Sequence, residues 1–265
     1  MKDKPLVSVV VPTFNSEQFL ERCLGSVRAQ TYGNIEVIAV DNYSKDKTKE
    51  IAERYQAKIV SSGAKRSEAR NIGVKEGEGT CVFFVDSDME LSASVVDECL
   101  RKIDMGYDGI IVPEVSIGEG FWAECKALEK SLYFGDDSIE AARFFRKSVF
   151  ESVGGYDLDL EAGEDWALNQ KIRKSGSRIG RIAAVVYHLE GRLSLHRTMQ
   201  KKCYYGKTLK RYALEHPEDA KKQLQPIRLA FLRGWRKLAR DPTHAFGMIV
   251  MKTCELAVGG IGALS

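Results

Sequence analysis

Short apolar runs rich in Val and Ile alternate with amphipathic stretches along the amino-terminal part of the chain. Apolar runs of this kind predict buried strands, and apolar residues spaced three and four apart predict helices. The predicted strands are 6–11, 35–40, 58–60 and 81–85, and the predicted helices are 17–29, 44–55 and 67–75. This alternation predicts an α/β fold with a mostly parallel central sheet and helices on both faces.

The predicted strand at 81–85 runs directly into Asp86-Ser87-Asp88. Open α/β sheets bind ligands at the carboxyl ends of their strands, and alternate positions there point the same way. Two carboxylates suit a divalent cation held against a diphosphate, because Mg²⁺ and Mn²⁺ prefer such oxygen ligands. The same three residues are equally suited to turning the chain and capping a following helix. The motif alone leaves both interpretations open.

The phosphate-binding motifs of the commonest nucleotide-binding folds are missing. No G-x-G-x-x-G follows the first predicted strand, and no G-x-x-x-x-G-K-[ST] occurs in the chain. A dinucleotide site or a P-loop is therefore not expected. A diphosphate without a glycine-rich loop needs another source of positive charge, and a metal ion at Asp86 and Asp88 would supply it.

Composition favours an ordinary globular protein of a reducing compartment. The chain has 265 residues, of which 44% are hydrophobic and 29% charged. Its six cysteines are scattered without a Cys-x-x-Cys pair or a paired His spacing, which argues against a zinc site and a disulfide framework. The apolar run near the amino terminus is too short for a signal peptide, so we expect a cytoplasmic protein.

Charge is distributed unevenly along the chain. Residues 1–191 carry 25 basic and 32 acidic side chains, a net charge of −7, whereas residues 192–265 carry 15 and 5, a net charge of +10. The basic section predicts an anionic partner. Nucleic acid, a membrane surface and the acidic part of the same chain are the candidates, and nucleic acid is not expected because no recognition motif accompanies the charge.

The basic section also contains amphipathic and apolar segments. Apolar residues recur at helical spacing over 224–238 with arginines around them, a pattern typical of a helix lying on an anionic bilayer. Residues 245–264 are mostly apolar but include Lys252 and Glu255, and each mid-span charge costs about 2.5–3.5 kcal/mol on insertion. A transmembrane helix is therefore disfavoured. An interfacial or re-entrant helix, an oligomer contact and a soluble helical cap remain open.

Eight segments carry a recognisable pattern, and they occur in the order Val7–Glu17, Leu20–Tyr32, Val40–Thr48, Ala69–Gly73, Val85–Asp88, Phe145-Arg146, Gly154–Asp157 and Gly163–Leu168. In this order they resemble family 2 glycosyltransferases of the GT-A fold, over residues 5–190. The resemblance implies an inverting transfer of a sugar from a nucleotide-diphosphate donor. Where this family commonly has Asp-Asp-Gly-Ser, the chain has Tyr43 in place of the Gly.

The resemblance also implies roles for single residues. The donor site would take its nucleotide and sugar contacts from Pro12, Thr13, Glu17, Asp41, Lys65, Asp86, Ser87, Glu164 and Trp166. The cofactor would be Mn²⁺ or Mg²⁺, with Asp86, Asp88, Glu90 and His188 as candidate ligands. His188 follows an apolar run at 182–186 that predicts a further strand. For Arg70 we expect a structural role.

Asp165 is the candidate catalytic base. It follows Glu164 in the first turn of a predicted helix whose inner face is Leu168 and Ile172. A helix amino terminus favours an ionised carboxylate, which a general base requires. Asp165 would accept the proton of the acceptor hydroxyl while the metal-bound diphosphate leaves from the opposite face. The alternative is that both carboxylates only cap the helix.

Together these observations predict a catalytic GT-A domain at 1–191, with a nucleotide-sugar half at 1–90 and an acceptor half at 91–191. A basic, helical, membrane-associating extension would follow at 192–265. The predicted function is hexosyl transfer to a hydroxyl of a lipid-linked, polyprenyl-type or cell-surface glycan precursor at the cytosolic face of a membrane. A sugar-phosphate nucleotidyltransferase would need a glycine-rich basic loop where Pro12–Asn15 stands. A catalytically silent glycan- or partner-binding module would not need Asp86, Asp88 and Asp165 together.

Overall fold

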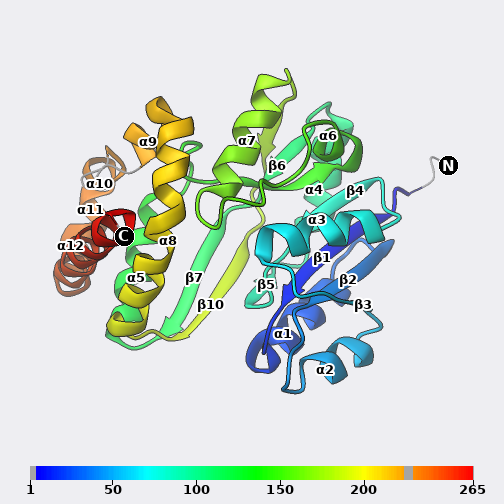
Figure 1. The fold of residues 1–265 in the computed structure, drawn as a ribbon, viewed down its shortest axis with the longest axis horizontal. Helices are drawn as coiled ribbons and strands as arrows, with labels where there is room; N and C mark the ends of the chain where they lie inside the picture. Colours follow the sequence, from blue (N-terminus) through cyan, green and yellow to red (C-terminus); the bar gives the residue numbers. More distant parts are fainter. Residues whose placement is uncertain (1–3, 224–228, 265) are drawn as a thin grey trace. The chain divides into compact units, whose positions relative to one another are not determined.

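The structure is a computed structural model that describes residues 4–223 and 229–264, and it divides into two compact units (Figure 1). The first unit comprises the chain up to Pro113 together with Ala141–Leu158 and Glu164–Tyr187. The second unit comprises Glu114–Glu140, Asp159–Gly163 and the chain from His188 onward.

A seven-stranded sheet forms the centre of the first unit, with strand order β3-β2-β1-β4-β8-β6-β9. Strands β1, β2, β3 and β4 are mutually parallel, β6 and β9 are parallel, and β8 runs antiparallel to both of its neighbours. The mostly parallel sheet predicted from the apolar runs is therefore confirmed. The strands are β1 (Val7–Thr13), β2 (Ile35–Asp41), β3 (Lys58–Ser61), β4 (Cys81–Phe84), β6 (Gly109–Ile111), β8 (Ala142–Arg146) and β9 (Ile179–Arg181). The short strand β5 (Met89–Leu91) follows β4 in the chain.

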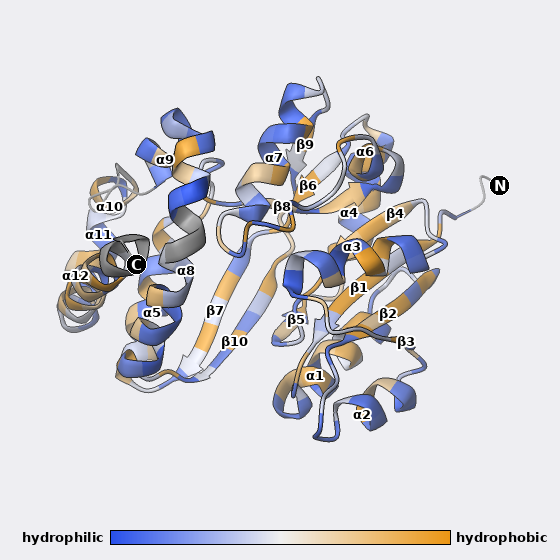
Figure 2. Ribbon diagram, viewed as in Figure 1, coloured by the Kyte–Doolittle hydropathy of each residue, from blue (hydrophilic) through white to orange (hydrophobic). Residues whose placement is uncertain are grey.

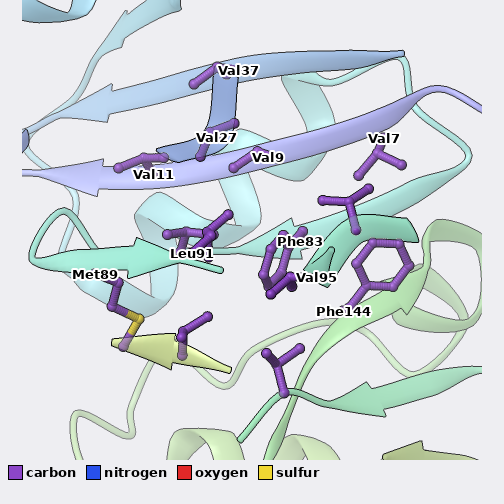
Figure 3. Close-up of a cluster of buried hydrophobic side chains, with 14 of the residues drawn as sticks. Val7, Val9, Val11, Val27, Val37, Phe83, Met89, Leu91, Val95 and Phe144 are labelled. Carbon is purple, nitrogen blue, oxygen red and sulfur yellow. The ribbon is translucent and has the colours of Figure 1, made fainter. Parts of the chain in front are cut away.

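The two faces of this sheet carry separate apolar cores. Alternate residues of β1 point to opposite faces, so Val9 packs in one core and Val10 in the other. Figure 3 shows the first core, in which the rings of Phe83 and Phe144 lie 5.7 Å apart. Every residue of β4 is buried, as its continuous apolar run predicted, and Figure 2 shows the hydrophobic colouring along β1.

Helices cover both faces, as predicted. Helices α1 (Glu17–Arg28) and α4 (Val95–Asp104) contribute side chains to the core around Val9. The opposite core receives α3, α6 and α7, which span Arg66–Glu76, Lys147–Ser152 and Glu164–Lys174. Helix α2 (Thr48–Arg54) buries Ile51 and Ala52 in the first core.

The strand predicted at 182–186 is wrong. Strand β9 ends at Arg181, and β10 (Val186–Arg192) begins only at the end of the predicted run. Side chains take the backbone donors in between: Glu98 Oε2 accepts from the N–H groups of Ala183 and Ala184 at 3.1 and 3.0 Å. Those N–H groups are thus unavailable for a strand ladder.

The second unit is mainly helical. Helix α5 (Phe121–Leu132) packs against α12 (Pro242–Leu264) around a small core that includes Cys125 and Met251. This packing groups 114–140 with the second unit, although we expected that segment in the catalytic domain. The other elements are β7 (Glu114–Glu119), which is next to β10 in the sheet, α8 (Leu195–Glu215), α9 (Pro217–Gln223), α10 (Leu229–Arg233) and α11 (Trp235–Arg240).

The helix predicted over 224–238 is represented by two short ones, α10 and α11, separated at Gly234. A Cβ at Gly234 would lie 2.3 Å from Leu132 Cδ2, so only glycine permits this close approach to α5. Residues 224–228 of the prediction lie outside the described part of the chain.

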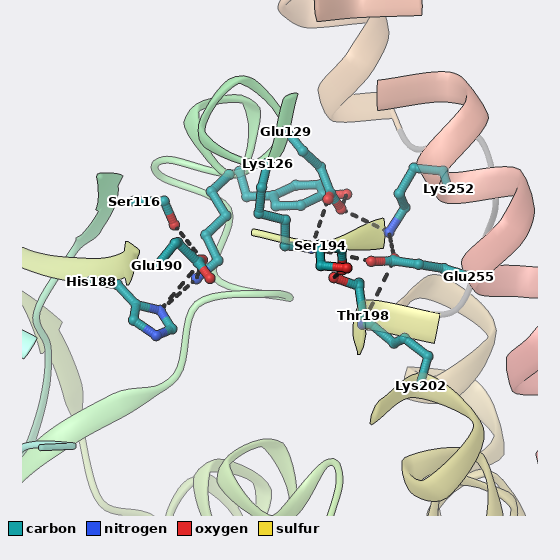
Figure 4. Close-up of polar contacts among 12 residues, drawn as sticks. Ser116, Lys126, Glu129, His188, Glu190, Ser194, Thr198, Lys202, Lys252 and Glu255 are labelled. Atoms are coloured by element: carbon teal, nitrogen blue, oxygen red, sulfur yellow. Dashed lines mark hydrogen bonds and ion pairs between the residues drawn. The ribbon is translucent and has the colours of Figure 1, made fainter. Parts of the chain in front are cut away.

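The mid-span charges of α12 belong to an ion-pair network within the second unit (Figure 4). Lys252 Nζ lies 2.7 Å from Glu129 Oε1 and 3.2 Å from Glu255 Oε2, and Lys126 Nζ lies 2.8 Å from Glu129 Oε2. Glu129 and Glu255 are buried, which only such pairing makes tolerable. Across 4–223 and 229–264, no helix combines the length and apolar character needed to span a bilayer.

Candidate active site

Asp86-Ser87-Asp88 forms the turn that joins β4 to β5 at the carboxyl end of β4. The N–H of Met89 donates to the carbonyl oxygen of Asp86 at 2.9 Å, which closes the turn. Ser87 Oγ lies 2.9 Å from Ser16 Oγ, so the turn after β4 contacts the turn after β1. The triplet therefore turns the chain, but into a strand and not into a capped helix.

Arg70 of α3 connects this turn to the second acidic motif. Its guanidinium donates from Nη2 to Asp86 Oδ1 at 2.8 Å and from Nη1 to Asp165 Oδ1 at 3.0 Å. The side chain is 3% exposed and lies against the ring of Tyr156, 5.1 Å from its centroid. We expected a structural role for Arg70, and the structure places it between the two carboxylates to which we assigned metal and base roles.

Glu164 and Asp165 occupy the first turn of α7, as predicted, but their surroundings differ. The Asp165 side chain is 41% exposed, and its Oδ1 accepts hydrogen bonds from Arg70 and from the Tyr156 hydroxyl, the latter at 3.0 Å. Glu164 is 2% exposed, is paired with Arg66, and lies 3.5 Å from Arg70 Nη1. Only Asp165 has a carboxylate that is both oriented and open to solvent.

Charge and burial shift the pKa values of these groups in opposite directions. Burial disfavours the ionised form of Asp86, but Arg70 and Arg66 outweigh that effect and hold the pKa of its carboxyl well below the usual range. Burial, followed by the negative charge of Asp165, raises the pKa of Glu164 to about 7. Burial likewise raises the pKa of Tyr156, which therefore stays a hydrogen-bond donor.

Asp41 ends β2 beside the end of β1, and its carboxylate organises the loops there. Its oxygens accept from Thr13 Oγ1 at 3.1 Å and from the N–H of Ser44 at 3.0 Å, and Lys49 Nζ lies 3.6 Å away. The carboxylate is 1% exposed, so any nucleotide contact of Asp41 competes with these internal bonds. Pro12, in β1, is paired with Val40 of β2.

The turn after β2 keeps a glycine-like conformation without glycine. Tyr43 has φ of 53°, in the left-handed region, and its side chain is largely exposed. Nearby, Glu17 Oε2 accepts from the N–H of Lys47 at 3.0 Å, and Asn15 Oδ1 accepts from the N–H of Lys45 at 3.0 Å. These bonds tie the loop after β1 to the loop after β2.

The other candidate residues have varied surroundings. Glu90 Oε2 accepts from Arg22 Nε at 3.1 Å, so its carboxylate is paired with a cation. His188 belongs to the second unit, where its Nδ1 lies 2.9 Å from both Glu114 Oε1 and Lys130 Nζ. Lys65 is exposed just before α3, and Trp166 is partly buried on α7. Their predicted roles stay predictions.

Within the described ranges, no cluster of three or more His, Cys, Asp and Glu side chains is arranged to hold a metal. Asp86 and Asp88 still fit Mg²⁺ or Mn²⁺, because such ions commonly bind one or two carboxylates and take their remaining ligands from phosphate and water. The Asp86 carboxylate is 25% exposed, which leaves it accessible to a ligand.

Sequence reasoning missed the pair of arginines on α3. Arg66 and Arg70 are four residues apart and therefore share one helix face, a signal that was readable in the chain. The role of this arginine pair depends on α7, which lies more than ninety positions away in sequence and supplies Glu164 and Asp165. A cavity of about 20 Å³ adjoins this cluster and is lined by Arg70, Tyr156 and Asp165, among others.

Another cavity lies in the second unit. Its volume is about 270 Å³, and its lining includes Ser131, Phe134, Arg233 and Lys237 but none of the residues predicted for the donor site. The cavity that adjoins the charged side chains of the first unit is the much smaller one of about 20 Å³.

An α/β sheet of this order, with an acidic turn after β4 and an acidic pair at the start of a later helix, defines a GT-A type glycosyltransferase fold. Residues 8–154 match the family described as Glycosyl transferase family 2. This match covers more than half of the chain, and the chain belongs to that family.

Among the relatives, poly(ribitol-phosphate) beta-N-acetylglucosaminyltransferase TarS of Staphylococcus aureus is 32% identical over 203 residues, 68% of this chain and 35% of TarS. GalNAc(5)-diNAcBac-PP-undecaprenol beta-1,3-glucosyltransferase of Campylobacter jejuni is 27% identical over 167 residues, 56% of this chain and 54% of that protein. The chain thus spans about a third and about half of their respective lengths.

The fold is also similar to a solved structure of mannosyltransferase PcManGT from Pyrobaculum calidifontis, determined in complex with GDP-Man and Mn²⁺. The TM-score is 0.68 at 18% identity, and the match covers 99% of this chain and 88% of PcManGT. At this identity the similarity establishes the fold alone.

Proposed function

We propose that this chain is an inverting, divalent-metal-dependent glycosyltransferase that moves a sugar from a nucleotide-diphosphate donor to an acceptor hydroxyl. The observation that carries the proposal is the bridge from Asp86 through Arg70 to Asp165. It brings a donor-side carboxylate and an acceptor-side carboxylate to one guanidinium, although they are far apart in sequence. An in-line displacement requires both functions close together.

The donor would bind where β1, β2 and β4 end. Asp86 and Asp88 would hold Mn²⁺ or Mg²⁺, which would neutralise the diphosphate as it leaves. The loops around Thr13, Glu17 and Asp41 would receive the nucleotide. PcManGT, which was solved with GDP-Man and Mn²⁺, supports this choice of donor and cofactor.

Asp165 would act as the general base. Arg70 and Tyr156 donate to its Oδ1, which orients the carboxylate, and its partial exposure gives an acceptor hydroxyl access. Glu164 is too buried to reach a substrate. A base acting opposite the departing diphosphate would invert the anomeric centre.

The acceptor would be a glycan precursor on a polyprenyl-type or other anionic lipid at the cytosolic face of a membrane. Exposed apolar side chains lie among basic ones in the second unit, including Leu232 and Trp235 beside Arg233 and Arg236. Such a surface suits an anionic bilayer, to which each nearby basic residue adds about 1 kcal/mol. The undecaprenol-linked substrate in the name of the Campylobacter relative supports this class of acceptor.

A donor screen followed by a release assay would test the proposal. Nucleotide sugars with Mn²⁺ should raise the Tm for one donor, and release of that nucleotide diphosphate should require Mn²⁺ or Mg²⁺. Chelation with EDTA should abolish release, and added metal should restore it. Full turnover in EDTA would refute metal dependence, and an α-linked product from an α-linked donor would refute inversion.

A further inference from the structure

The guanidinium of Arg70 and the expected divalent metal ion compete for the carboxylate of Asp86. Arg70 Nη2 binds Asp86 Oδ1 at 2.8 Å, whereas a divalent ion at the turn after β4 also needs the Asp86 carboxylate. A bound cation would also place positive charge beside a guanidinium that is almost fully buried. Metal at Asp86 and the Arg70–Asp86 hydrogen bond therefore oppose each other.

The guanidinium of Arg70 has an alternative set of partners. Asp165 Oδ1 lies 3.0 Å and Glu164 Oε1 lies 3.5 Å from Nη1, both on the acceptor side. Within the residues described, Arg70 Nε is buried and lacks a hydrogen-bond partner, so its present position leaves one donor unsatisfied. The adjoining cavity of about 20 Å³ gives the side chain room to shift.

We propose that Arg70 is a positioning residue that couples metal binding at Asp86 to the catalytic base. Before metal binds, its guanidinium is shared between Asp86 and Asp165. When a divalent cation takes Asp86, the guanidinium moves wholly to Asp165 and Glu164. The inference rests on the proposed function, because it takes Asp86 as a metal ligand and Asp165 as the base.

Coupling of this kind is reciprocal, so changes on the acceptor side must alter metal affinity. In Arg70→Lys, a single ammonium cannot reach both carboxylates with two separate donors. It should settle by Asp165 and Glu164, which leaves Asp86 free. Removing the charge of Asp165, by Asp165→Asn, should instead leave the guanidinium more firmly on Asp86.

The test is a titration of the full chain with Mn²⁺ in the absence of nucleotide. The EPR signal of free Mn²⁺ measures how much of the ion has bound. We expect Mn²⁺ to bind about tenfold more tightly to Arg70→Lys and about three- to tenfold more weakly to Asp165→Asn, the range that one charge-assisted hydrogen bond supports. Arg66→Lys is the matched control, since Arg66 is on the same helix face and pairs with Glu164. Its affinity should stay within about twofold of the native value.

A merely structural Arg70 would loosen the site, so weaker or unchanged Mn²⁺ binding by Arg70→Lys overturns the inference. If that variant fails to fold, judged by circular dichroism, Asp165→Asn decides alone, and unchanged affinity overturns the inference. Native protein that binds no Mn²⁺ at all refutes the metal site of the proposed function and this inference with it. If the native protein binds Mn²⁺ but the variants do not show the predicted changes in Mn²⁺ affinity, only the coupling is refuted.

Discussion

Replacing Glu164 with Gln should make the stability of the protein less dependent on pH. Five charged groups meet at this site: Arg66, Arg70, Asp86, Glu164 and Asp165. When all five are ionised, the cluster of two arginines and three carboxylates carries a net charge of −1. Protonation of one carboxylate makes the cluster neutral. Glu164 is the most buried of the three acids, so it is the one that gains most from being neutral.

The size of the effect follows from the pKa. Folding raises the pKa of Glu164 from 4.5 to about 7, so the stabilisation is present below pH 4.5 and is lost as pH rises toward 7. At 1.36 kcal/mol per pH unit, ionising this buried acid costs about 3.4 kcal/mol at high pH. Between pH 5 and pH 8 the native protein should lose about 2.5 kcal/mol relative to Glu164→Gln.

Urea unfolding at pH 5 and pH 8 measures this difference directly. The matched control is Glu68→Gln, whose side chain is exposed on α3 and should change the free energy of unfolding by less than about 0.5 kcal/mol. If the native protein and Glu164→Gln showed parallel pH dependence, Glu164 would be ionised throughout. The neutral-acid interpretation of the site would then be abandoned.

Four further predictions concern the site, its loops and the second unit. Asp165→Asn should lower sugar transfer at least about a hundredfold while the Kd for the donor, measured by calorimetry at saturating Mn²⁺, stays within about twofold; unchanged transfer would assign the base elsewhere. Asp88→Ala should lower metal-dependent release of the nucleotide diphosphate by about a hundredfold at fixed Mn²⁺, and undiminished release would remove Asp88 from the metal site. Tyr43→Gly should stabilise the protein by about 0.5–1 kcal/mol in urea unfolding because φ at this position is 53°, whereas destabilisation would mean that the ring packs more favourably than its exposure indicates. Exchanging both Leu232 and Trp235 for Ser should weaken flotation with phosphatidylglycerol vesicles about tenfold, and equal flotation would contradict membrane docking through this surface.

Much of the first unit was readable along the chain. Apolar runs located β1, β2 and β4, and helical spacing located α1 and α3, because period-two and period-3.6 patterns report which faces are buried. The strand predicted at 182–186 was wrong because a side chain from a distant part of the sequence intervenes. Glu98, more than eighty residues earlier, binds the backbone N–H groups that a strand would have used.

By itself, the sequence determined the order of strands and helices over residues 6–85, the acidic turn that follows a buried strand and the acidic pair at the start of a helix. Each of these depends on neighbours within about one turn or one strand. Only the tertiary structure decided that Arg70 joins Asp86 to Asp165, that Glu164 is buried while Asp165 is open, and that Lys252 and Glu255 are paired inside the second unit. Those outcomes depend on side chains from distant elements meeting at one place, and the free energy of a buried charge is set by the partners that packing brings to it.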